Sequence, residues 1–173
     1  MAELLAVLQK IKRNGNKKKL GITSILRNPQ LIAMDKFIFI DHTADIQYEA
    51  YGFSFPEALS NAALAMFSVM SKVEEVGDEE AVKIEEKAET IEELVGYVLG
   101  DILAESSSAE LFFSKFAVGK FIEKEKGFVL EGTAYGEEMS PEKGKLDVKA
   151  VTMHEISVTR DGSLWKIKVI LDI

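Results

Sequence analysis

The sequence predicts an α+β fold, a single domain in which a mixed or antiparallel sheet packs against two main helices. Two segments, 55–71 and 91–105, carry apolar residues at helical spacing, and a capping box precedes each. Around them, about seven or eight short segments have the alternation or the β-branched composition of strands. Two helices among this many strands are typical of α+β proteins. The length of 173 residues suits one domain with a real core.

Residues 1–33 differ from the rest of the chain in charge. They carry seven Lys and Arg against Glu3 alone, a net charge of +6, whereas residues 34–173 carry 14 Lys and Arg against 28 Asp and Glu, a net charge of −14. The spacing of apolar residues in 1–12 predicts a short amphipathic helix, which is too short to span a membrane. Its basic residues follow the apolar part instead of preceding it, unlike those of a secretory signal. We expect 1–33 to be a dispensable extension, or the result of an early start with Met34 as the true beginning. The alternative is a basic arm that binds a partner or an acidic surface.

Charge and cysteine content exclude several function classes. A body with a net charge of −14 repels phosphates, so we expect any contact with RNA to be indirect and to run through a basic protein partner. The chain has no cysteine, which excludes disulfides, thiolate catalysis and Cys-ligated zinc. This composition fits a cytoplasmic protein.

The first two strands are expected at 36–40 and 46–52. The first is rich in β-branched and aromatic residues, and the second alternates apolar with polar residues. The corner between them reads Asp41-His42-Thr43-Ala44-Asp45 and holds one of only two histidines in the chain.

Each helix has a start signal and an apolar stripe. Ser54 and Glu57 form the first capping box, and Thr90 and Glu93 form the second. The first stripe contains Leu59, Ala62, Ala63, Met66, Phe67 and Met70, and the second contains Ile91, Leu94, Val95, Val98, Ile102 and Leu103. Gly96 and Gly100 each cost the second helix about 1 kcal/mol relative to alanine, and we expect them to permit close approach to the sheet.

The remaining segments are mostly strands. An acidic loop at 74–81 precedes a strand at 82–88, and after the second helix we expect strands at 112–122, 127–135, 146–151, 154–159 and 164–171. The last two are joined by the hairpin signal Arg160-Asp161-Gly162-Ser163. Trp165, Ile167, Val169 and Leu171 share one face of the last strand, so Asp172 is expected on the other.

Asp45 and Asp172 are far apart in the sequence, but each lies at the end of a predicted strand. If those strands are neighbours, the two carboxylates and the terminal carboxylate of Ile173 converge. Three anionic oxygen groups suit a hard cation such as Ca²⁺, Mg²⁺ or Mn²⁺, and the cation would relieve their mutual repulsion. In the alternative, Asp45 is a turn or capping residue and Asp172 belongs to a frayed end.

His42 and His154 invite a catalytic reading with Asp45, as a general base or a metal ligand. In the alternative, each histidine donates to a carbonyl or carboxylate and holds a corner in shape. The sequence contains no glycine-rich phosphate loop and no Gly-x-Ser-x-Gly or His-Glu-x-x-His motif.

The corner motif, extended to Ile46 and followed by Ala50, Gly52 and the first helix, resembles the archease family. The C-terminal segment agrees with it: Val148-Lys149-Ala150-Val151-Thr152-Met153-His154, then Trp165, then Val169-Ile170-Leu171-Asp172-Ile173. The resemblance runs from about Met34 to Ile173. Met153 stands where the family leads us to expect an aromatic residue, and the second helix lacks the usual tryptophan near Tyr97.

The resemblance implies a role in tRNA splicing. Archeases assist the RtcB-type tRNA-splicing ligase, so this chain is expected to promote guanylylation and multiple turnover of that RNA ligase without being an enzyme itself. It also implies a divalent cation, calcium in structures of the family, held by Asp45, Asp172 and Ile173. His42, Lys149 and His154 are expected to support this site or to contact the partner.

Two other functions stay open from the sequence. One is a metal-dependent phosphoester hydrolase that uses His42, Asp45, His154 and Asp172. The other is a chaperone-like binding module that uses its sheet and does not need the aspartates.

Overall fold

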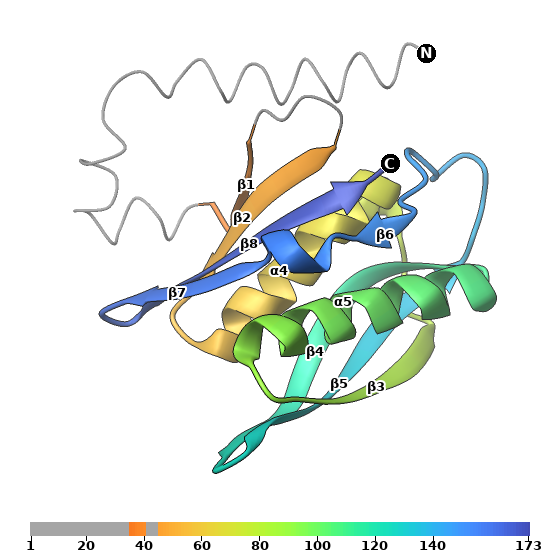
Figure 1. Ribbon diagram of the computed structural model, residues 1–173. Helices are drawn as coiled ribbons and strands as arrows, with labels where there is room; N and C mark the ends of the chain where they lie inside the picture. The colour runs from red at the N-terminus through yellow and green to blue at the C-terminus, as the bar shows by residue number, and fades with distance from the viewer. Residues whose placement is uncertain (1–34, 41–44) are drawn as a thin grey trace.

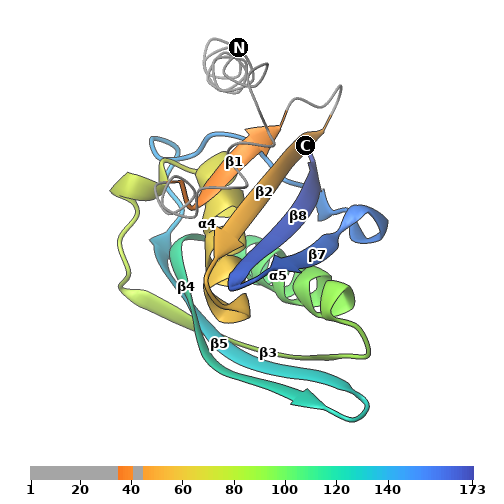
Figure 2. The same cartoon turned by 90° about the vertical axis from the view of Figure 1, so that its left-hand side faces the viewer.

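The computed structural model describes residues 35–40 and 45–173, and they form three layers. A five-stranded sheet lies on one side, a three-stranded sheet lies on the other, and two helices fill the space between them (Figures 1 and 2). The predicted α+β fold with two main helices is therefore confirmed. The expected single sheet is two separate sheets, and every strand pair in them is antiparallel.

The five-stranded sheet is organised around the last strand, β8 (Leu164–Asp172). One edge of β8 pairs with β2 (Ile46–Gly52), which pairs in turn with β1 (Phe37–Ile40). The other edge pairs with β6 (Ala150–Val151) and β7 (Ser157–Asp161). Along β8, Ile167, Val169 and Leu171 are fully buried, which confirms the predicted inner face.

The three-stranded sheet has the order β3-β5-β4. Its strands are β3 (Glu80–Ala88), β4 (Leu111–Lys124) and β5 (Gly127–Glu138). The long β4–β5 hairpin extends past the helices (Figure 1). Both strands are longer than predicted, because pairing continues from Leu111↔Glu138 at one end to Lys124↔Gly127 at the other.

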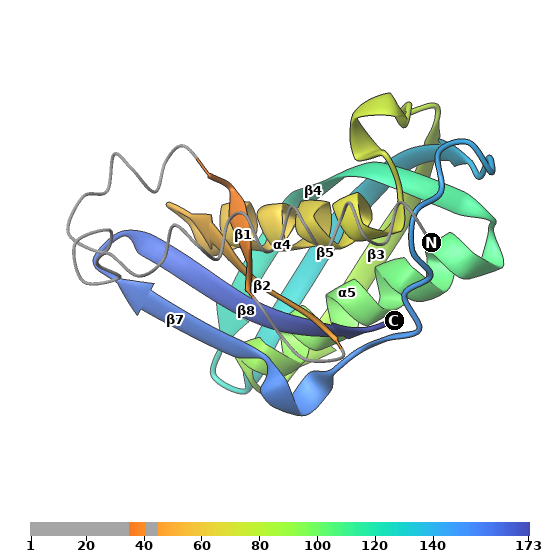
Figure 3. The same cartoon turned by 90° about the horizontal axis from the view of Figure 1, so that it is seen from above.

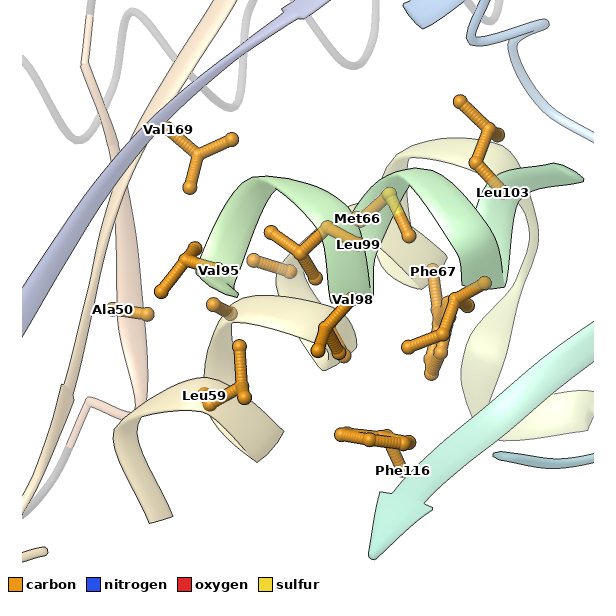
Figure 4. Packing of buried hydrophobic residues seen from close by; sticks show 14 of the residues in the cluster. Ala50, Leu59, Met66, Phe67, Val95, Val98, Leu99, Leu103, Phe116 and Val169 are labelled. Atoms are coloured by element: carbon orange, nitrogen blue, oxygen red, sulfur yellow. The ribbon is translucent and has the colours of Figure 1, made fainter. Parts of the chain in front are cut away.

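The two helices, α4 (Phe55–Met70) and α5 (Ile91–Ser108), are buried on more than one face. Helix α4 contacts β2 and β8 on one side and β4 on the other, and in Figure 4 its side chains lie between Ala50 and Val169 of the first sheet and Phe116 of the second. The predicted stripe of α4 is buried as expected. Its apolar surface is wider, however, because two sheets cover it; the additional buried residues are Phe55, Ala58, Ala65 and Val69.

Both predicted helix starts are confirmed. The Thr90 hydroxyl accepts from the Glu93 amide, and the Glu93 carboxylate accepts from the Thr90 amide, which is a complete capping box. At α4, Ser54 accepts from the Glu57 amide, but Glu57 accepts from the amide of Phe53, one residue before the cap.

The strand predicted at 146–151 is wrong except at its end, since only Ala150–Val151 pairs as a strand. The residues before it cap α4 instead. The Lys145 and Leu146 amides donate to the Met70 and Val69 carbonyls, and the Lys145 ammonium donates to Ser68. These carbonyls belong to the last turn of the helix and have no partner inside it. Sequence periodicity could not show that a neighbouring helix end competes for these amides.

The strand predicted at 154–159 starts later than expected. Its first residues form a short 3₁₀ turn, η3 (Met153–Glu155), and β7 begins at Ser157. Leu171 and Lys168 are three residues apart in β8, whereas their partners Val151 and Ser157 are six residues apart. The segment between β6 and β7 therefore has three additional residues, which bulge out of the sheet edge.

The turn packs on α5 at Gly96, where an added Cβ would lie 2.2 Å from the Met153 sulfur. Gly96 therefore permits close approach of the η3 turn, whereas the prediction was close approach to the sheet. Gly100 does not, because an added Cβ would meet nothing within 4 Å.

A second short 3₁₀ turn, η2 (Val73–Glu75), falls in the acidic loop between α4 and β3. Among the described helices, none is long and apolar enough to cross a membrane.

Candidate metal centre

The proposed site lies where β2 begins and β8 ends. Ile46 pairs with Leu171 in the antiparallel register, so Asp45, the residue before Ile46, and Asp172, the residue after Leu171, lie at the same end of this strand pair. Ile46 and Leu171 are buried against the helices, and strand alternation directs the Asp172 side chain to the other face of the sheet. The fold thus brings together two residues separated by most of the sequence.

A second segment fixes the C-terminal end of β8. Ala150 pairs with Asp172 on the edge opposite β2, and the Lys149 amide donates to the Asp172 carbonyl over 2.9 Å. The Lys149 ammonium donates to the main-chain oxygen of Ile173 over 3.0 Å. Val148, just before this segment, is buried and anchors it to the core. The structure therefore adds Lys149 and Ile173 to the neighbourhood of the two aspartates (Figure 3 shows the C-terminus at this end of β8).

The donor set fits a hard cation in its chemistry. It offers carboxylate and main-chain oxygens and no sulfur, which is what Ca²⁺, Mg²⁺ and Mn²⁺ take from proteins. Within the described ranges, which omit 41–44, no group of three or more His, Asp or Glu side chains is placed to hold a metal. A complete shell at this site accordingly needs the Ile173 carboxylate, water or a partner's groups beside the two aspartates.

The two histidines have different outcomes. His42 lies outside the described residues. His154 is exposed in the η3 turn. The Thr152 amide donates to Ile170, and Ser157 pairs with Lys168, so His154 lies alongside that part of β8 and at least two residues from Asp172. This places His154 on the same edge as Lys149 but not at the aspartate pair.

The same outer face of the sheet carries a polar network that the sequence did not single out. The Tyr51 hydroxyl donates to Glu49 over 2.6 Å, and the Lys166 ammonium lies 3.3 Å from the same carboxylate. Burial and the neighbouring Glu49 carboxylate raise the pKa of Tyr51 far above its usual value. The alternation of residues 49 and 51 with the core-facing residues of β2 could have placed them on the outer face from the sequence. Their partner Lys166 could be found only from the strand register.

Comparison with known proteins gives a consistent result. The model of the Archease protein family matches residues 37–173. The protein archease of Sulfolobus acidocaldarius is 37% identical over 142 residues, which cover 81% of this chain and 100% of the relative. The protein archease of Methanothermobacter thermautotrophicus is 40% identical over 141 residues, with the same coverage of 81% and 100%.

Two solved structures are also similar. The solution structure of Methanobacterium thermoautotrophicum protein 1598 superposes with a TM-score of 0.72 at 38% identity, over 81% of this chain and 100% of that chain. The crystal structure of an archease from Thermotoga maritima gives a TM-score of 0.51 at 24% identity, over 78% and 94% of the two chains, and that likeness concerns the fold alone.

Proposed function

The chain belongs to the archease family, and on that premise we propose that it is a non-enzymatic activator of an RtcB-type tRNA-splicing ligase. It promotes guanylylation of the ligase and multiple turnover in RNA ligation, through a divalent cation held by Asp45, Asp172 and Ile173. The observation that carries the proposal is the pairing of Ile46 with Leu171, which brings Asp45 and Asp172 to the same end of the sheet, beside the Lys149–Ile173 contact.

The protein's own residues have two tasks in this mechanism. The pairing of β8 with β2 and β6 fixes the backbone of Asp172 and of Ile46, the residue after Asp45, before a partner arrives. The net charge of −14 on residues 34–173 attracts a basic protein surface and repels free RNA, so the ligase supplies the contact with RNA. A bound divalent cation would neutralise the charge of the two aspartates and relieve their mutual repulsion.

A hydrolase built on the same residues has less support. General acid or base catalysis needs the histidine within hydrogen-bond reach of the reacting group. His154 lies along the edge of β8 and away from Asp172, in a turn that packs on α5. Turnover of a phosphoester by the purified protein alone, lost in Asp45→Asn, would reinstate this function.

The test is multiple-turnover RNA ligation and guanylylation by the cognate ligase, with wild-type protein, Asp45→Asn and Asp172→Asn. Asp161→Asn is the matched control, since Asp161 is an exposed aspartate of the same sheet at the opposite end of β8. We expect stimulation by wild type and the control, and loss in both site variants. Stimulation that survives in both would remove the cation from the mechanism, and no stimulation by wild type would overturn the proposal.

A further inference from the structure

The described part of the chain exposes four large hydrophobic side chains, Phe53, Tyr97, Ile122 and Met153. Two of them lie at the same turn of α5. Tyr97, 42% exposed, follows Gly96, and the Met153 side chain of the η3 turn, 40% exposed, packs on Gly96. Aromatic and methionine side chains that remain exposed next to each other are typical of surfaces that bind another protein.

Tyr97 belongs to the outward face of α5. Ala104, seven residues later, is also exposed, and at Gly100 between them an added Cβ would meet nothing within 4 Å. Residues three, four and seven positions apart lie on one face of a helix. Figure 1 shows α5 on the viewer's side of the molecule, and Figure 2 shows it between β7 and β3. This face of the helix is therefore open beside the η3 turn.

The charge around this face is negative. Helix α5 contains no basic residue and four acidic ones, Glu92, Glu93, Asp101 and Glu105. Burial and the neighbouring Asp101 carboxylate raise the pKa of Glu86, so the acidic rim continues onto β3. A negative rim around an apolar centre is complementary to a partner surface that is basic.

The same surface is continuous with the proposed metal centre. Ala150 pairs with Asp172, and Met153 follows Ala150 by three residues, which span at most about 11 Å. An interface of ordinary size covers about 800 Å² of each partner, an area roughly 30 Å across. One partner can therefore contact the metal centre and the face of α5 at the same time.

We propose that Tyr97, Met153 and Asp101 mark a docking face for a basic surface of the ligase, next to the metal centre. This inference rests on the proposed function. The apolar pair supplies most of the affinity, because aromatic side chains buried at the centre of an interface dominate binding. The acidic rim selects a basic partner and speeds its approach.

The test is the affinity of the cognate ligase for the full chain, measured by titration calorimetry. We expect Tyr97→Ala and Met153→Ala each to bind at least about tenfold more weakly than wild type. Phe53→Ala and Ile122→Ala are matched controls, because they truncate the other two exposed hydrophobic side chains. We expect both controls to bind within about twofold of wild type, and urea unfolding checks that all four variants fold.

Charge reversal gives a second readout that does not depend on the packing of the η3 turn. We expect Asp101→Lys to weaken binding by at least about threefold. Glu85→Lys is its control, since the change in charge is the same but Glu85 is exposed and alternates with Glu86, on the other face of β3. The difference between the two variants should shrink as salt is added, because ions screen exposed charges.

Three results would overturn the docking face. Affinities of Tyr97→Ala and Met153→Ala within about twofold of wild type would show that the ligase docks elsewhere, and if ligation is still stimulated, the proposed function stands. Equal losses in Phe53→Ala and Ile122→Ala would show that no particular face is used. A dimer of the free protein that Tyr97→Ala abolishes would assign the face to a second copy of the chain.

Failure of the proposed function gives a different pattern. No binding of the ligase by wild-type protein would overturn that function and the docking face together. Weak binding by Tyr97→Ala, with stimulation intact in both Asp45→Asn and Asp172→Asn, would support the docking face and remove the cation from the mechanism.

Discussion

The ammonium group of Lys149 lies 3.0 Å from the main-chain oxygen of Ile173, on the strand edge next to Asp172. A positive side chain thus already contacts one of the groups that the proposed cation would use. A cation bound at the proposed site would compete with Lys149 for the same oxygen and would repel its ammonium group.

We predict that Lys149→Met binds Ca²⁺ more tightly than wild type, by about threefold to tenfold. A charge repulsion of roughly 1 kcal/mol at an exposed site corresponds to a factor of about five. Titration calorimetry measures the change. Lys168→Met is the control, because Lys168 is a lysine of β8 whose partner is Glu155 rather than the chain terminus. Unchanged or weaker binding in Lys149→Met would contradict competition and would indicate that Lys149 holds the site in shape.

Asp172→Asn should have opposite effects on stability with and without a divalent cation. Without one, the variant removes a negative charge at the end of the sheet where Asp45 also lies, so we expect its free energy of unfolding to rise by about 0.2–1 kcal/mol. With Ca²⁺ at about 100 times its dissociation constant, wild type gains about 2.7 kcal/mol and the variant gains little. Urea unfolding, followed by the single tryptophan, Trp165, measures both conditions. The same order of stability in EDTA and in Ca²⁺ would contradict a shared cation.

Much of this arrangement could be predicted from local patterns. The two helices, their starts and the inner face of β8 follow from periodicity and capping residues, which depend on near neighbours in the chain. The candidate site is a different case. Nothing local shows that the strands next to Asp45 and Asp172 are neighbours. The sequence offered their convergence only on that condition, and the family resemblance implied it. The register of β2 against β8 shows that the two strands pair.

The predictions that failed depend on distant neighbours. A strand was predicted from Leu146, but the amides of Lys145 and Leu146 donate to carbonyls at the C-terminal end of α4. The late start of β7 follows from the packing of η3 against Gly96 of α5. In both places a helix far away in the sequence decides what a strand-like segment does, and a single sequence contains no signal for it.

The two glycines of α5 should respond differently to alanine. An added Cβ at Gly100 meets nothing within 4 Å, so Gly100→Ala should raise the free energy of unfolding by up to about 1 kcal/mol through helix propensity. At Gly96 the same methyl group would lie 2.2 Å from the Met153 sulfur and 3.0 Å from Ile156 Cδ1. We expect the gain at Gly96 to be lost to this overlap and the η3 turn to shift.

The two alanine variants are matched controls for each other, since the chemical change and the helix are the same. Urea unfolding measures stability, and the NMR chemical shifts of His154 report movement of the turn. Equal stabilisation by both alanines, with His154 unmoved, would contradict the close packing of η3 on α5.

Tyr48 is fully buried, and its hydroxyl has no hydrogen-bond partner within the described residues. A buried polar group without a partner lowers stability by about 1–3 kcal/mol. We therefore predict that Tyr48→Phe raises the free energy of unfolding by about 1 kcal/mol at neutral pH. Tyr51→Phe should lower the free energy of unfolding instead, because it removes the hydrogen bond that the Tyr51 hydroxyl donates to Glu49 over 2.6 Å.

The effect of Tyr48 should also depend on pH. Burial raises the pKa of Tyr48 far above the ordinary tyrosine value of about 10. Above pH 10 the unfolded chain therefore releases a proton that the folded chain retains, so stability falls as pH rises, by up to about 1.4 kcal/mol per pH unit for this group. Tyr48→Phe removes this group. Between pH 10 and 11 the variant should therefore lose less stability than wild type, by up to that amount. Urea unfolding at pH 7, 10 and 11 measures the difference, and parallel pH profiles for wild type and Tyr48→Phe would show that the hydroxyl is not buried as the structure places it.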